Sequence, residues 1–206
     1  MANIPHPQDE DLPDDVWRVV NAVPPLNLIR IMAWAPGNLE SVVRLSDSVL
    51  NRSDLDPVLR QVALIRLTVV VGSRYEQTML ESVSEGLGMD EPLMEAARRG
   101  STAPGLSELQ QMAAKLAEEL AGAPRPSAET FAYLKAHLST RHLVELVQAI
   151  GFYLMQTRTI ETFAIEHEDP PVDLARRMDG AVPEALALWR AGRGPISTAE
   201  RGGGAS

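Results

Sequence analysis

Apolar residues recur at helical spacing along most of the 206-residue chain. The clearest stretch is SELQQMAAKLAEELAG, residues 107–122, whose apolar side chains fall on one face of a helix. Similar spacing predicts six further helices and two shorter helical segments. The helices are expected at 26–35, 38–51, 74–86, 91–100, 126–138 and 140–165, and the segments at 172–179 and 183–191. Because no segment has a convincing strand pattern, we predict an all-α fold.

One segment, VLRQVALIRLTVVVG at residues 58–72, is ambiguous between helix and strand. Its C-terminal half is rich in β-branched residues, which favour strands. Its length exceeds that of an ordinary strand, and Leu59, Val62 and Val69 follow helical spacing. We therefore predict a buried helix that begins after an Asp56 cap and ends at Gly72.

The two ends of the chain differ from its centre. Residues 1–15 contain three prolines and five carboxylates, which predicts a solvated extension. The last residues, GRGPISTAERGGGAS, are Gly-rich. We predict an N-terminal extension at 1–24, a helical domain at 25–180, and a short helix followed by a disordered tail at 181–206.

Composition restricts the chemistry that is available. The formal net charge of -9 argues against a nucleic-acid surface, and the absence of cysteine excludes disulfides, thiolate metal sites and thiol redox chemistry. No His/Asp/Glu group has metal-ligand spacing, and no Gly-rich nucleotide loop is present, so we expect neither metal nor cofactor. No apolar run is long enough to span a membrane, and the acidic N-terminus is unlike a secretory signal, so we expect a cytoplasmic protein.

The candidate chemistry centres on the stretch VVVGSRYEQTML, residues 69–80. Ser73 and Glu76 have the spacing of a capping box, in which each side chain bonds the other residue's backbone N–H. A carboxyl group beside an apolar run can instead have its pKa raised by desolvation, which suits general acid/base catalysis. The sequence leaves Glu76 with both roles open, and the capping role is favoured.

Arg66 presents a second choice, because it lies in the apolar segment at a position turned inward. A buried arginine needs a carboxylate partner. The partner is either structural, with Glu76, Glu145 or Glu40 as candidates, or an anionic ligand.

Three stretches carry a family resemblance. They are DPVLRQVALIRL (56–67), VVGSRYEQ (70–77) with GLG following at 86–88, and STRHLVELVQAIGFYLMQTR (139–158). Their order and spacing resemble the carboxymuconolactone decarboxylase family, which includes the alkylhydroperoxidase D-like proteins, over residues 26–166. The resemblance implies an alkylhydroperoxidase D-like helical bundle assembled as trimers or hexamers.

The chain departs from this family at its functional positions. The peroxidase branch has two cysteines, a histidine and a glutamate where this chain has Ser73, Glu76, Leu80 and Gln61, so thiol peroxidase activity is excluded. The decarboxylase branch has a glutamate at the position of Glu76 and a histidine at that of Leu80. This chain keeps the first and lacks the second.

The resemblance therefore implies a cofactor-free, decarboxylase-like lyase or isomerase that acts on a small carboxylate or lactone. Glu76 and Tyr75 are the candidate catalytic residues. The candidate substrate-binding residues are Arg66, Arg60, Arg158, Tyr153 and Ser73. The alternative is a catalytically silent helical oligomer that binds a small molecule or a protein partner.

Overall fold

The computed structural model describes residues 2–169, and it divides the chain into two compact units. Within the described residues, unit 1 comprises 2–47 and 165–169, and unit 2 comprises 48–164. These residues form α-helices and one 3-10 turn and no strand, which confirms the expected all-α class for them. The predicted boundary at 24/25 does not coincide with a boundary between units. The expected boundary at 180/181, the helical segments 172–179 and 183–191, and the Gly-rich tail all lie outside the described residues.

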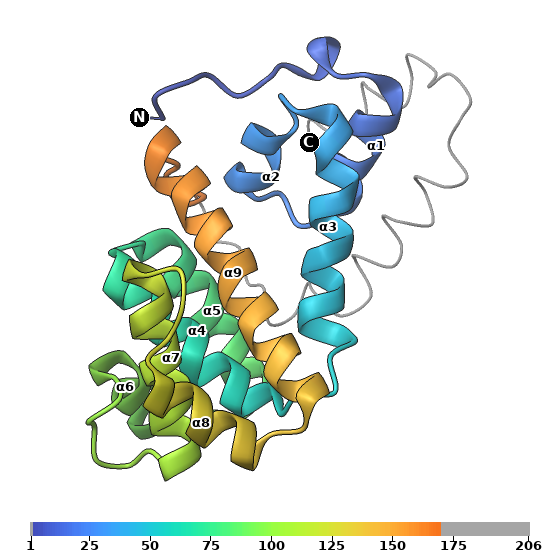
Figure 1. Ribbon diagram of the computed structural model, residues 1–206. Coiled ribbons are helices and arrows are strands. Elements are labelled where there is room, and N and C mark those ends of the chain that lie inside the picture. The colour runs from blue at the N-terminus through green and yellow to red at the C-terminus, as the bar shows by residue number, and fades with distance from the viewer. Residues whose placement is uncertain (1, 170–206) are drawn as a thin grey trace. The chain divides into compact units, whose positions relative to one another are not determined.

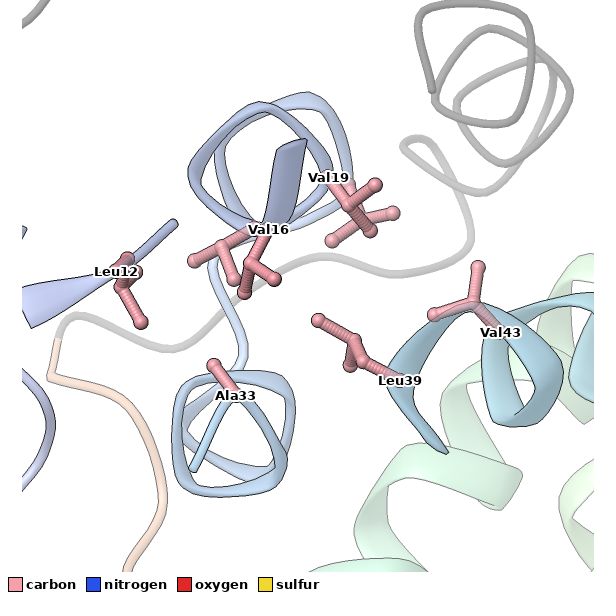
Figure 2. Close-up of a cluster of buried hydrophobic side chains, with 8 residues drawn as sticks. Leu12, Val16, Val19, Ala33, Leu39 and Val43 are labelled. Carbon is pink, nitrogen blue, oxygen red and sulfur yellow. The ribbon is translucent and has the colours of Figure 1, made fainter. Parts of the chain in front are cut away.

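Unit 1 contains a 3-10 turn, η1 (Asp9–Asp11), and the helices α1 (Asp14–Ala22) and α2 (Asn27–Met32), together with most of α3 (Pro36–Asn51). Their apolar side chains point toward one another and form a small aliphatic core (Figure 2). The core consists of Leu12, Val16, Val19, Val20, Val23, Ala33, Leu39 and Val43.

Helix α1 was not predicted, and residues 1–15 are not uniformly solvated. Leu12 is only 5% exposed, and Val16 is 1% exposed. The prolines and carboxylates around them gave the segment a polar composition, but Leu12, Val16, Val19 and Val20 recur at helical spacing and face the core. Trp17 also fixes the preceding turn, because its indole N–H donates to Asp9 at 3.1 Å.

Unit 2 is organised around the helix α4 (Pro57–Val71). Helix α4 packs against α5 (Arg74–Gly86), α6 (Glu91–Arg99), α7 (Glu108–Gly122) and α9 (Thr140–Phe163), and α8 (Ala128–His137) packs against α7 and α9 (Figure 1). Seven consecutive residues of α4, from Leu59 to Ile65, are buried because neighbouring helices surround it. This position explains why its sequence is apolar on every side and has no clear helical face.

Both ends of α4 follow the sequence prediction. The Asp56 carboxylate accepts the backbone N–H of Leu59 at 2.6 Å and caps the first turn. Gly72 adopts the left-handed conformation at φ 75°, and Ser73 N–H donates to Thr68 O at 3.0 Å. This glycine termination reverses the chain at once, so that α5 begins only three residues after α4 ends.

Candidate functional site

Arg66 is held by partners outside the predicted site, and Arg158 is exposed. Arg66 donates to Glu118 at 2.7 Å and to the carbonyl of Arg98, the second-last residue of α6, at 2.7 Å. The prediction of a structural ion pair is confirmed, but all three proposed partners were wrong, because Glu118 on α7 was not recognised as a neighbour of α4. Arg158 is exposed on α9, whereas Tyr153 on the same helix is buried.

The contact of Arg66 also explains a nearby glycine. Gly100 has φ 97°, and a Cβ atom there would overlap the side chains of both Arg66 and Glu118. Glu118 additionally accepts the N–H and the hydroxyl of Ser101, at 3.1 and 2.7 Å. This group therefore ties α4, α6 and α7 together, and we assign it a structural role.

The remaining candidates belong to a group of buried polar residues within unit 2, which we call the polar cluster. Its members come from α4, from the start of α5 and from α9, three helices that pack against one another. They are Arg60, Gln61, Ser73, Glu76, Tyr153 and Gln156, each no more than 6% exposed. Sequence reasoning missed Gln156, and treated Gln61 only as a lost family position. The signal available for Gln156 was its place one helical turn after Tyr153.

Among residues 2–169, six buried atoms of the polar cluster have no hydrogen-bond partner. They are Arg60 Nε, Gln61 Nε2 and Oε1, Ser73 Oγ, Glu76 Oε2 and Gln156 Oε1. A buried polar atom without a partner costs about 1–3 kcal/mol, and folded proteins contain few of them. Their concentration on three touching helices indicates a place where a ligand or ordered water supplies the missing bonds.

Glu76 is the unusual acid of the polar cluster. It is 6% exposed, and burial raises the pKa of its carboxyl group to about 8. Desolvation is the cause of this shift, and no cation offsets it. Glu76 is therefore a neutral carboxylic acid at pH 7, able to donate a proton.

Tyr153 interacts electrostatically with two ionisable members of the polar cluster, Glu76 and Arg60. Burial raises the pKa of its phenol, and the Glu76 carboxylate raises it further, whereas Arg60 lowers it. Burial also lowers the pKa of Arg60, while Tyr153, Asp56 and Glu145 raise it. These effects place the Tyr153 side chain within range of both Glu76 and Arg60. Its phenol stays protonated at neutral pH and is a hydrogen-bond donor.

The predicted capping box is wrong. Ser73 is the residue before α5, but its side chain makes no cap hydrogen bond, and both Ser73 Oγ and Glu76 Oε2 are without partners. Ser73 is 0% exposed and Glu76 is 6% exposed, and both side chains are packed among the helices instead of bonding the backbone at the start of α5. Tyr75, also predicted to be catalytic, is 3% exposed and about 100° around α5 from Glu76, and its role stays a prediction.

A mutation distinguishes this arrangement from a capping box. We expect Ser73→Ala to change the free energy of unfolding by less than about 0.5 kcal/mol, because no cap is lost. In contrast, Ser139→Ala should cost about 1 kcal/mol, because Ser139 Oγ accepts the N–H of His142 at 3.1 Å. Urea denaturation of both variants tests the difference, and equal losses would restore the capping role of Ser73.

Comparisons with known proteins give no relative, so the assignment of a function rests on the geometry of the polar cluster. A scan against protein-family models gives no match, and a search of curated proteins gives none either. Among the described residues, no group of three His, Asp or Glu side chains could hold a metal ion. None of the helices in residues 2–169 is long and apolar enough to cross a membrane.

Proposed function

We propose that the protein is a cofactor-free, decarboxylase-like enzyme in which Glu76 is the general acid. The observation that carries this proposal is a neutral, buried carboxylic acid with an unpartnered oxygen, close to a tyrosine that also interacts with a buried arginine. A general acid works best when its pKa lies near the working pH, and a pKa of about 8 meets that condition. The resemblance to the carboxymuconolactone decarboxylase family supports the same reaction class.

Each residue has a role in this reaction. Arg60 Nε binds the substrate carboxylate, since it is a buried charged donor without a partner. When the carbon–carbon bond to the carboxylate breaks, CO₂ leaves and its bonding electrons remain on the substrate as an enolate. Arg60 and the Tyr153 hydroxyl stabilise this charge. Glu76 then transfers its proton to the carbon and is reprotonated from water.

The charge balance of this scheme fits the polar cluster. A monocarboxylate and the enolate formed from it each carry one negative charge, so one cation suffices throughout. Among residues 2–169, Arg60 is the only basic residue that is buried. Because Leu80 replaces the histidine of the family's decarboxylases and is 1% exposed, Glu76 has no second proton carrier at that position.

The test is the pH dependence of CO₂ release from a panel of small carboxylated lactones and β-keto acids. We expect kcat/KM to be constant below pH 8 and to fall about tenfold per pH unit above it, because the active form of Glu76 is protonated. Release of CO₂ that rises with pH through 8 would contradict an acid role for Glu76. Substrate binding without any turnover would favour the alternative of a catalytically silent binding protein.

A further inference from the structure

The two glutamines of the polar cluster are not used by the proposed proton transfer. Gln61 is 0% exposed, and both its amide nitrogen and its amide oxygen lack partners. Gln156 is 6% exposed, and its Oε1 is also without a partner. A buried amide oxygen accepts hydrogen bonds and never donates them, so each of these two oxygens requires a donor from elsewhere.

The glutamines adjoin the residues assigned to the reaction. Gln61 follows Arg60 on α4, and Gln156 lies one turn after Tyr153 on α9, on the same face of that helix. Arg60 and Tyr153 interact electrostatically, and α4 packs against α9, so the two glutamines lie on the two helices that hold Arg60 and Tyr153.

The free atoms define complementary chemistry for a ligand. Arg60 Nε is a charged donor and requires an anionic oxygen. The oxygens of Gln61 and Gln156 require hydroxyl or amine donors, and an amine would place a second cation beside buried Arg60 at a high cost. Hydroxyl groups supply the donors without adding charge.

We infer that the polar cluster binds a hydroxylated monocarboxylate, with its carboxylate on Arg60 and its hydroxyl groups on the amide oxygens of Gln61 and Gln156. This inference rests on the proposed function for the placement of the carboxylate, and it narrows the substrate class. A lactone without a hydroxyl group leaves both amide oxygens unpaired. A dicarboxylate brings a second negative charge, and residues 2–169 hold no second buried cation to balance it.

Neighbouring carboxylates do not block Arg60. Asp56 acts on Arg60 electrostatically, but it is exposed and caps α4. Glu145 also acts on Arg60, and its oxygens accept from Ser53, Leu55 and Arg141 at 2.8 to 2.9 Å. In the described part of the chain, the Arg60 guanidinium makes one hydrogen bond, from Nη2 to the carbonyl of Leu50 at 3.2 Å, which leaves Nε available.

The experiment compares matched acids that differ by one hydroxyl group. Lactate against propionate, and 3-hydroxybutyrate against butyrate, are titrated into the full chain and followed by NMR chemical shifts. We expect the hydroxylated acid of a pair to bind at least about tenfold more tightly, because an unmade buried hydrogen bond costs about 1–3 kcal/mol. Gln61→Met and Gln156→Met should each reduce this preference, and Gln148→Met, at an exposed position on α9, should leave it unchanged.

The free energy of unfolding of the variants gives a second test, which applies even if a variant binds none of the acids. Because Gln61→Met removes two unpartnered buried atoms at similar volume, its free energy of unfolding without ligand should equal or exceed that of the wild type. A loss of more than about 1 kcal/mol would show that the amide has a structural role and would overturn the inference. Equal affinity for the paired acids, or no binding of any of them, would overturn it as well, and would leave ordered water as the partner of these atoms. A hydroxyl preference without CO₂ release would instead refute only the proposed reaction.

Discussion

Replacing Glu76 with glutamine is expected to reduce turnover by about 10²–10⁴-fold while leaving the helical fold intact. Glutamine has nearly the same shape as a protonated glutamic acid, and it is neutral, so the packing around α5 is preserved. Its amide N–H is far too weakly acidic to transfer a proton to the enolate. The measurement is kcat/KM for CO₂ release at pH 7, with circular dichroism to confirm helix content.

A matched control on the same helix separates proton transfer from a general effect of losing a carboxylate. Glu85 is an exposed residue near the end of α5, and Glu85→Gln should retain wild-type turnover. The pH profile gives a second readout, since the fall in kcat/KM above pH 8 should disappear in any residual activity of Glu76→Gln. Full turnover in Glu76→Gln would refute the catalytic assignment.

The second large effect is on the pH dependence of stability. The carboxyl pKa of Glu76 is about 8 in the folded protein and 4.5 in the unfolded chain. Between these values the folded state holds a proton that the unfolded state has released, so stability falls as the pH rises. The stabilisation of the folded state by protonated Glu76 is complete below pH 4.5 and is lost by about pH 8. The slope is at most about 1.4 kcal/mol per pH unit.

Urea denaturation of the wild type and Glu76→Gln between pH 5 and 9 measures this contribution. We expect the wild type to lose stability relative to the variant across this range, so that Glu76→Gln is the more stable protein by a few kcal/mol at pH 9. Carboxylates with lowered pKa, such as Glu119 and Glu145, act in the opposite direction and below pH 4.5, because their stabilisation is lost as they are protonated. Parallel curves for the two proteins would show that Glu76 is ionised at neutral pH in the folded state.

The residues of the polar cluster were partly predictable. The sequence singled out Glu76 as a carboxylate beside an apolar run, and the family resemblance implied Ser73, Arg60 and Tyr153. It could not distinguish Arg60 from Arg66, since both are arginines within the same apolar helix. Arg66 is paired with Glu118, 52 residues further along the chain, and only the packing of α7 on α4 creates that pair.

Local patterns predicted most helical elements in residues 26–165, because most of these helices carry their own apolar spacing and α4 carries its own end signals. Asp56 and Gly72 mark the ends of α4 in both the sequence and the structure. Helix α1 was missed because a polar composition concealed four well-spaced apolar residues.

The tertiary structure alone decided the state of Glu76. The stretch SRYEQ is compatible with a capping box, which the sequence favoured, and also with a buried acid, because both use the same residues at the same spacing. The packing of α4, α5 and α9 removes Glu76 from water, and desolvation is a property of the neighbours that surround a group rather than of its own sequence. The same packing also leaves Gln61 and Gln156 buried without partners, which no local pattern could indicate.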